Sequence, residues 1–283
     1  MNFKNLQILT YFVMYNLLFS CSSPKPPENM VKVNGGTLST FIPYTDTPAK
    51  QPVIAFYIDK NLVSIADFKK FAAERKFITD AEKFGNSTIF DVKDQSWGMV
   101  DSANFLFPLG KKNRYQPDEN HPATQISWQD AKYYCECQGK RLPTDAEWEF
   151  AAKSGKEDYN EMYAWGNDMK IGNKYKANYW QGDFPSNNTQ EDGFLYTSPV
   201  GYFGANSIGI SDMGGNVWQW CSDDIKPTPE EAKYDTASRK VLRGGSFLCD
   251  PKVCHGFRVI GRSSSTPETS SLHVGFRCVK DIK

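Results

Sequence analysis

Two cysteines near the C-terminus have the greatest chemical potential in this sequence. Cys249 and Cys254 lie in RGGSFLCDPKVCHGFR, residues 243–258. Pro251 lies between them, and because its ring fixes φ and removes a backbone donor, a loop is predicted here. The spacing matches neither the CxxC of a zinc knuckle nor that of a thioredoxin site. A local disulfide is the simplest interpretation. The alternative is a thiolate pair that binds Cu(I), with a third thiolate supplied by a substrate cysteine.

Histidines do not extend this cysteine pair into a larger metal site. The chain has three of them, His121, His255 and His273, and none is spaced as a metal-binding pair. A zinc or non-haem iron centre built on histidine is therefore not expected. The sequence also contains neither a Gly-x-Ser-x-Gly elbow nor a phosphate-binding P-loop, so no motif supports a hydrolase or a nucleotide-dependent function.

Two other segments are rich in oxygen ligands. NYWQGDFPSNNTQEDGF (178–194) and SDMGGNVWQW (211–220) combine acidic and amide side chains with glycines. Converging side-chain and backbone oxygens of this kind suit calcium. The alternative is a set of Asx-turns on solvated loops. The side chains concerned are Asn178, Asp183, Asn187, Asn188, Glu191 and Asp192 in the first segment, and Asp212, Asn216 and Gln219 in the second.

Composition limits the class of protein. The chain has 283 residues, of which 40% are hydrophobic, and its 33 basic residues balance 33 acidic ones. The length suits one large domain or two small ones. A chain without net charge and without a run of basic residues does not predict a positively charged surface that would bind nucleic-acid phosphates, so no nucleic-acid partner is expected.

The N-terminus has the pattern of an export signal. MNFKNLQILTYFVMYNLLFSC places Lys4 before an apolar run that is too short to span a membrane, and ends at Cys21. The pattern resembles a bacterial lipoprotein cleavage site; the alternative is ordinary signal cleavage with Cys21 incidental. We therefore expect a signal peptide over 1–21, a linker over 22–31 and a domain over 32–283. A lipid on Cys21 would hold the domain in the bacterial cell envelope, on its periplasmic or outer-membrane face.

The elements that position these residues are predicted from local signals. Residues 53–59 are typical of a strand. Three Ser/Thr-x-x-Asp/Glu capping patterns predict helices over 64–75, 127–138 and 144–153. After residue 154 the periodicity fades into short Gly-, Asn- and Trp-rich segments. The prediction is one α+β domain with little regular secondary structure. Six cysteines besides Cys21 favour disulfides in an exported protein, although spacing leaves their connectivity open.

Four stretches together resemble the formylglycine-generating enzyme family, also called sulfatase-modifying factors. They span nearly all of the predicted domain in the family's order, with GKRLPTDAEWE and the RGGS…GFRC ending as the specific motifs. The resemblance implies a single formylglycine-generating-enzyme-like domain, related to C-type lectins. The stretches are residues 77–90, 126–152, 177–203 with 209–224, and 242–278.

The resemblance also implies an activity. Family enzymes keep both cysteines after RGGS, which favours the copper interpretation of Cys249 and Cys254 over the disulfide. Cu(I) held by the pair would take a target protein's cysteine, in a Cys-x-Pro-x-Arg motif of a sulfatase, as third ligand. Oxygen would then convert that cysteine to formylglycine. Ser246 matches the family's serine, either as a residue near the site or as a turn residue beside two glycines.

Other site residues follow by the same matching. One calcium site falls on Asn178, Tyr179, Asp192 and Phe194. A second falls on Asp212, Gly215, Val217 and Gln219, where glutamine replaces the usual glutamate and weakens the site. Cys135 and Cys278 match a family disulfide, whereas Cys137 and Cys221 are additional cysteines without an assigned pairing.

Two departures keep a second hypothesis open. Residues 250–253 are Asp-Pro-Lys-Val instead of the usual His-, Ser- and Tyr-rich segment, and His273 replaces an asparagine near the substrate groove. Both changes concern recognition of the peptide more than copper binding. The first hypothesis is a tethered, copper-dependent oxidase that acts on sulfatases. The second is a non-catalytic envelope lipoprotein of the same fold that serves as a scaffold or binding component, as in gliding or secretion machinery.

Overall fold

The computed structural model describes residues 26–282 apart from 44, 46, 226–229, 231–232 and 234–236. The predicted signal peptide and Cys21 lie outside the described residues. Within the described part, no helix has the length and apolar character needed to cross a membrane.

Side-chain capping explains where the helices begin. The hydroxyl of Ser64, Ser127 or Thr144 accepts a hydrogen bond from the third helical residue, whose carboxylate accepts one in return from the capping backbone. These three helices confirm the predictions made from the same patterns. A fourth capping box starts a short helix that the sequence analysis did not identify. The helices are α1 (Ile65–Arg75), α2 (Asp80–Phe84), α3 (Trp128–Cys137) and α4 (Asp145–Ala152).

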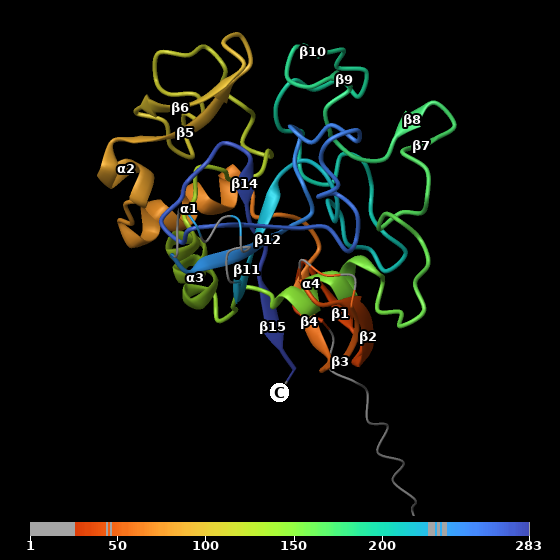
Figure 1. The fold of residues 1–283 in the computed structure, drawn as a ribbon. Helices are drawn as coiled ribbons and strands as arrows, with labels where there is room; N and C mark the ends of the chain where they lie inside the picture. The colour runs from red at the N-terminus through yellow and green to blue at the C-terminus, as the bar shows by residue number, and fades with distance from the viewer. Residues whose placement is uncertain are drawn as a thin grey trace, which may run out of the picture.

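Two sheets, one of three strands and one of four, join distant parts of the chain. An antiparallel sheet has the order β1-β4-β15 (Met30–Val33, Phe56–Asp59, Val279–Asp281). A four-stranded sheet has the order β13-β12-β11-β14 (Arg262–Ser265, Arg239–Arg243, Trp218–Ile225, Val274–Gly275), in which only β11 and β14 run parallel. Figure 1 shows the four-stranded sheet at the centre of the molecule, with α1, α2 and α3 on one side and α4 below.

Four two-stranded ribbons complete the strand structure. Figure 1 places β5–β6 and β9–β10 at the top of the molecule and β2–β3 at the bottom, near the C-terminus. The ribbons are β2 (Gly36–Phe41) with β3 (Pro48–Val53), β5 (Asn86–Asp91) with β6 (Ser96–Asp101), β7 (Lys170–Ile171) with β8 (Lys174–Tyr175), and β9 (Gly182–Asp183) with β10 (Asn187–Asn188).

The single strand predicted over 53–59 is wrong, because two strands share this stretch. Val53 ends β3, which pairs with β2, whereas Phe56 begins β4, which pairs with β1 and β15. Between them Ile54 is 86% exposed. The chain therefore changes sheets at Ile54, and β-forming residue types alone do not reveal such a change.

A disulfide between Cys135 and Cys278 connects α3 to the segment that leads into β15. Their Cα atoms are 5.7 Å apart, and 143 residues separate them in the sequence. This pairing is the one that the family resemblance implies. Cys137 and Cys221 are free thiols, the first half-buried and the second buried.

Candidate active site and calcium sites

The loop that carries the cysteine pair begins where β12 ends. Gly244 and Gly245 follow Arg243 with φ angles of 92° and 67°, in the left-handed region that glycine adopts most readily. A Cβ atom on Gly245 would lie 2.7 Å from the Phe257 nitrogen. The two ends of the loop therefore approach so closely that only glycine fits at this point.

The loop holds Cys249 and Cys254 against each other. The structure pairs them as a disulfide, with Cα atoms 5.1 Å apart, which is the interpretation that spacing alone favours. Each sulfur also lies 3.4 Å from a backbone nitrogen that donates to it, Ser246 for Cys249 and Gly256 for Cys254. These two N–H groups therefore fix the positions of the sulfurs from the backbone.

The donor set fits a soft metal ion of low coordination number. Among the described residues, no group of three or more His, Cys, Asp or Glu side chains is arranged to hold a metal. Two thiolates without a harder ligand match Cu(I). Because the structure pairs the two sulfurs as a disulfide, a reductant would have to open the pair before Cu(I) could bind there.

Ser246 belongs both to the turn and to the cysteine site. Its side chain is fully buried, and its hydroxyl oxygen accepts a hydrogen bond from the Leu248 nitrogen at 3.3 Å. Its carbonyl oxygen accepts one from the Cys249 nitrogen at 2.9 Å, and its own nitrogen donates to the Cys249 sulfur. The Ser246 backbone thus holds Cys249 through two hydrogen bonds, and its hydroxyl holds the Leu248 backbone beside it.

The unusual segment between the cysteines is anchored to the β9–β10 ribbon. The buried Asp250 carboxylate accepts hydrogen bonds from the backbone nitrogens of Lys252 and Phe184, at 2.8 and 3.2 Å. The Lys252 ammonium group lies 2.6 Å from the Asp183 carboxylate. Asp250 and Lys252 therefore replace the family's usual residues with polar contacts that hold the loop in place.

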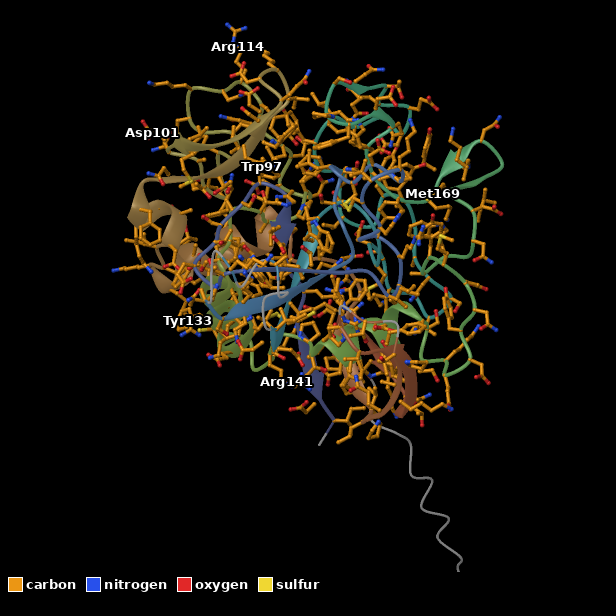
Figure 2. All side chains as sticks on the ribbon, in the orientation of Figure 1. Trp97, Asp101, Arg114, Tyr133, Arg141 and Met169 are labelled. Carbon is orange, nitrogen blue, oxygen red and sulfur yellow. A yellow bond between two sulfur atoms is a disulfide. The ribbon has the colours of Figure 1, made fainter. Side chains whose placement is uncertain are left out.

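A row of aromatic rings leads from the cysteine loop to His273. Trp180 packs on Phe184, Phe184 on Phe90, and Phe90 on Trp97, with ring centroids 5.1 to 5.4 Å apart. The Trp180 nitrogen donates to the Cys249 carbonyl at 3.1 Å. Figure 2 shows Trp97 on the inner side of the β5–β6 ribbon. The row gives the cysteine loop a continuous apolar flank.

His273 ends this row as a neutral residue. Its ring lies 4.9 Å from that of Trp97, and its Nδ1 is 2.7 Å from the Ser271 hydroxyl. Burial lowers the pKa of His273 to about 4, so the imidazole is uncharged at neutral pH. The substitution of the family's asparagine therefore adds bulk and a ring without adding charge.

The first predicted calcium site is brought together as a cluster of oxygens. The Asp192 carboxylate accepts hydrogen bonds from the nitrogens of Tyr179 and Phe194, at 3.3 and 3.0 Å. The buried Asn178 Oδ1 has no hydrogen-bond partner within the described residues. A buried oxygen without a partner and a buried carboxylate are the kinds of group that a hard cation takes as ligands. Asp192 also lines a cavity of about 530 Å³, which gives an ion a route to the site.

Gln181 completes this first site. Its amide nitrogen donates to Asp192 Oδ2 at 2.7 Å and to the Tyr179 carbonyl, while its Oε1 accepts from the Asp192 nitrogen at 3.3 Å. Rotation of the amide by half a turn would point Oε1 at the cluster instead. The sequence analysis missed Gln181. It lies two positions after Tyr179, and because side chains alternate along an extended chain, this spacing would place both residues on the same side.

The second predicted calcium site does not fit the ion. Gln219 Nε2 donates to the Asp212 carbonyl at 2.6 Å, and the fully buried Arg277 also donates to this carbonyl, at 3.3 Å. Desolvation lowers the pKa of Arg277 to about 10, so the guanidinium keeps its charge at neutral pH. The Gln219 amide therefore presents a donor to the Asp212 carbonyl, where calcium would need a further oxygen ligand.

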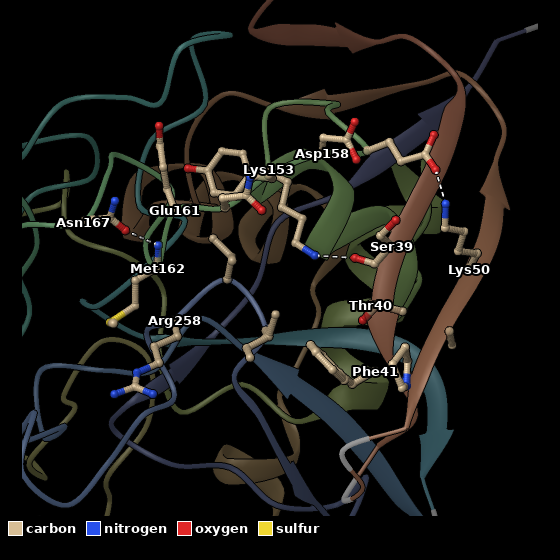
Figure 3. A pocket seen from close by; sticks show the side chains of 17 residues that line it. Ser39, Thr40, Phe41, Lys50, Lys153, Asp158, Glu161, Met162, Asn167 and Arg258 are labelled. Carbon is tan, nitrogen blue, oxygen red and sulfur yellow. Dashed lines mark hydrogen bonds and ion pairs between the residues drawn. The ribbon is translucent and has the colours of Figure 1, made fainter.

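A separate cavity of about 510 Å³ lies away from the cysteine pair, beside the β2–β3 ribbon (Figure 3). Its lining combines Phe41 and Met162 with Lys153 and Arg258, and neither Cys249 nor Cys254 lines it. Figure 3 shows Lys153 directed towards the backbone of Ser39, where its ammonium group donates at 2.6 Å. The cavity therefore does not belong to the thiol chemistry.

Comparisons with known proteins agree on one family. The domain described as "Sulfatase-modifying factor enzyme 1-like domain" matches residues 18–282. The formylglycine-generating enzyme of Streptomyces coelicolor is 41% identical over 247 residues, which cover 80% of this chain and 78% of that protein. The inactive Cα-formylglycine-generating enzyme 2 of Bos taurus is 35% identical over 277 residues, 88% of this chain and 87% of that protein.

The solved structures show the fold. PvdO from Pseudomonas aeruginosa superposes with a TM-score of 0.63 at 21% identity, covering 89% of this chain and 94% of PvdO. This agreement confirms the predicted single domain of mixed α and β structure. At this level of identity the likeness concerns the fold and not the activity.

Proposed function

Because the chain belongs to the family of sulfatase-modifying factors, we propose that it is an oxidase that converts a cysteine of a target protein to formylglycine. The target would carry a sulfatase-type Cys-x-Pro-x-Arg motif, and oxygen would be the oxidant. The observation that carries the proposal is the pair of Cys249 and Cys254, whose sulfurs meet in the loop after RGGS and each accept a backbone N–H.

The chain's own residues have separate tasks in this reaction. The reduced Cys249 and Cys254 would hold a Cu(I) ion, which when bound supplies the activation of oxygen and binds the substrate thiol. Ser246 would keep Cys249 in place through two backbone hydrogen bonds to it and a third from its hydroxyl to the Leu248 backbone. Asp250 fixes the intervening loop against the β9–β10 ribbon. Trp97, at the exposed end of the aromatic row, offers an apolar contact for an extended peptide, whereas Trp180 and Phe90 are buried and support the loop from inside.

Calcium would stabilise the substrate side of the molecule through the first site. Asn178 and Asp192 would supply side-chain oxygens, and Tyr179 and Phe194 backbone oxygens. The unpaired Asn178 Oδ1 supports this assignment. The expected role is structural, because these residues fix the segment that carries Trp180 and thereby the support of Cys249.

Peptide oxidation tests the proposal directly. The reduced protein is loaded with Cu(I) and incubated in air with a Cys-x-Pro-x-Arg peptide, and the peptide mass is followed. The proposal expects conversion of thiol to aldehyde by the wild type and none by Cys249→Ser or Cys254→Ser. Cys137→Ser is the matched control, since it removes a half-buried free thiol and is expected to keep activity. An inactive wild type that binds copper with its pair reduced would refute the proposal for this peptide.

A non-catalytic scaffold is the second candidate, supported by a specific observation. The structure pairs Cys249 with Cys254, and a relative of similar identity bears the name of an inactive enzyme. A disulfide that resists reduction in the folded protein, together with failure to bind Cu(I), would favour this role. The thiol count of the native protein under mild reductant separates the two candidates.

We also propose that Cys21 carries lipid and anchors the domain to the bacterial cell envelope. The proposal rests on the sequence pattern alone, with a short apolar run before Cys21 and a polar linker after it. Cys21→Ser is expected to move the protein from the membrane fraction to the soluble one. An unchanged distribution, with no lipid detected on Cys21 by mass spectrometry, would refute it.

A further inference from the structure

The cavity beside the β2–β3 ribbon has an apolar rim that water reaches. Its volume of about 510 Å³ lies in the range of sites that bind small molecules. Phe41, Met162 and Ile260 line it, and they are 39%, 40% and 41% exposed. Figure 3 shows Phe41 on the ribbon and Met162 on the opposite side of the cavity. A ligand would therefore meet apolar side chains on both sides.

One cation of the lining is left without a partner in the described part of the chain. Lys50 pairs with Glu157 at 2.8 Å, and Lys153 pairs with Glu149 at 2.7 Å. Arg258 differs from both, because its buried Nε has no hydrogen-bond acceptor among the described residues. A buried donor without an acceptor is destabilising. The cavity therefore lacks an acceptor that a ligand could supply.

The charges of the lining indicate what kind of ligand this is. A guanidinium binds a phosphate or carboxylate through two N–H groups at once. Asp158 and Glu161 also line the cavity, but both are exposed, and Figure 3 shows them towards the top of the view with Arg258 towards the bottom. They would face a positive group of the ligand. An anion, a cation and apolar chains together are the chemistry of a zwitterionic phospholipid.

The start of the described chain favours a bilayer as the source of this lipid. A Cβ atom on Gly155 would lie 3.7 Å from the Val33 side chain in β1, so the segment that enters the cavity wall rests on the first strand. Cys21, the proposed lipid site, precedes Met30 at the start of β1 by nine residues. Nine residues span at most about 30 Å. A lipid on Cys21 would therefore keep the cavity near the membrane.

We infer that the cavity binds the phosphate of a zwitterionic phospholipid on Arg258, with the acyl chains on the apolar rim. The domain then docks on the bilayer by its β2–β3 ribbon. Figure 1 places this ribbon at the bottom and the β9–β10 ribbon, which anchors the cysteine loop, at the top. Docking thus leaves the cysteine loop open to a target protein. The inference draws on the proposed lipid anchor and goes beyond the proposed oxidase.

Vesicle binding tests the docking without copper or peptide. The chain from residue 21 onward contains every described residue, and Cys21→Ser keeps it free of lipid. This protein is pelleted with vesicles of phosphatidylethanolamine and phosphatidylcholine. We expect Phe41→Ser and Arg258→Gln, each added to it, to weaken binding about fivefold to tenfold. Equal binding by these variants, or no binding by the parent protein, would overturn the inference.

Met99→Ser is the matched control for the apolar rim. Met99 is 64% exposed on β6, which Figure 1 places at the opposite end of the molecule from β2–β3. We expect this variant to bind vesicles as the parent protein does. A loss equal to that of Phe41→Ser would show that exposed apolar side chains bind lipid wherever they lie, and would overturn the assignment to the cavity.

A short-chain lipid distinguishes a phospholipid site from a plain anion site. Dihexanoylphosphatidylcholine, below its micelle-forming concentration, and inorganic phosphate are each titrated into the same protein in a calorimeter. We expect the lipid to bind more tightly than phosphate, and Arg258→Gln to weaken lipid binding about tenfold. Equal affinity for phosphate and lipid would overturn the lipid assignment. Circular dichroism establishes that each variant is folded.

The anchor and the docking site can fail separately. Mass spectrometry of the protein from cells reports whether Cys21 carries lipid, whereas the vesicle experiment uses protein without it. Vesicle binding with an unmodified Cys21 would refute the anchor and support the cavity. A lipidated Cys21 without vesicle binding by the unlipidated protein would support the anchor and refute the cavity.

Discussion

Arg243 directly precedes the cysteine loop in the chain, but the two regions differ in how fully their polar groups are paired. The fully buried Arg243 lies in a cluster of five charged side chains, where its Nη2 is 2.6 Å from the Glu149 carboxylate. Glu149 also pairs with Lys153 at 2.7 Å and with Arg262 at 2.9 Å. Asp145 bridges the two arginines. Every charge in this cluster has a partner of opposite sign.

The cysteine loop is supported by fewer and weaker contacts. Each sulfur accepts one backbone N–H, and Val253 between them is 71% exposed. The contrast teaches that RGGS combines two functions. Its arginine belongs to a buried cluster of charges, whereas its serine contacts the buried Cys249 at the start of a loop that leads to the half-buried Cys254. A relative can therefore keep the fold and lose the chemistry.

The largest expected effect comes from removing a charge from the buried cluster around Arg243. Glu149→Gln leaves Arg243, Lys153 and Arg262 without their shared carboxylate. We expect the free energy of unfolding to fall by about 3–5 kcal/mol, because a buried charge loses its partner. Thermal denaturation measures the change. Glu157→Gln is the matched control, since its pair with Lys50 is exposed and is expected to matter by less than about 1 kcal/mol. Equal losses of unfolding free energy in the two variants would show that the buried cluster contributes no more to stability than an exposed ion pair.

Acid should weaken the same cluster. Burial acts to raise the pKa of Glu149, but Arg243, Lys153 and Arg262 outweigh it, and the pKa of Asp145 is lowered likewise. The folded state thus binds fewer protons than the unfolded state. The stabilisation is fully present above about pH 4.5 and is lost as the pH falls towards the lowered values, at about 1.4 kcal/mol per pKa unit. Urea midpoints between pH 7 and 3 should fall less steeply for Glu149→Gln than for the wild type.

Ser246→Ala tests whether the serine that follows the buried cluster also positions Cys249. Its expected effect on turnover rests on the proposed oxidase activity. The variant leaves the buried Leu248 nitrogen without its acceptor, so we expect a loss of about 1–2 kcal/mol in stability. A displaced Cys249 should also lower turnover about tenfold. Denaturation and peptide oxidation measure the two effects, with the exposed Ser186→Ala as control. Unchanged turnover at reduced stability would make Ser246 a turn residue only.

The smallest effect is expected at the surface of the loop. Lys252 and Asp183 form an ion pair in which both side chains are about two-thirds exposed or more. Lys252→Ala should therefore change the free energy of unfolding by less than about 1 kcal/mol and leave Cu(I) affinity unchanged. A larger loss of copper affinity would show that the exposed half of the loop takes part in holding the sulfurs.

Local signals predicted the helices well because each signal and its effect lie within a few residues. Ser64, Ser127 and Thr144 each cap the helix that follows directly. The same kind of signal, Thr79 with Glu82, was present for α2 and was not used. The family resemblance supplied the RGGS loop and the pairing of Cys135 with Cys278, which no local signal encodes.

The buried charges and the contacts of Gln219 could not be predicted in this way. Glu149 meets Thr40 and Arg262, which lie 109 and 113 residues away in the sequence. The exchange of glutamate for Gln219 was visible in the sequence as a lost charge. Its consequence depends on Arg277, 58 residues further along, whose side chain turns inwards to the same carbonyl. Such contacts depend on the tertiary fold, and the spacing of residues in the sequence does not predict them.

The sheet β1-β4-β15 has a consequence for how the protein is made. β4 lies between the first strand of the described chain and the last, and it pairs with β15 only through residues 279–281. During synthesis from the N-terminus, one edge of β4 stays unpaired until residues 279–281 have left the ribosome. A truncation that removes residues 279–281 would therefore leave an open sheet edge, which marks the chain as incomplete to cellular quality control.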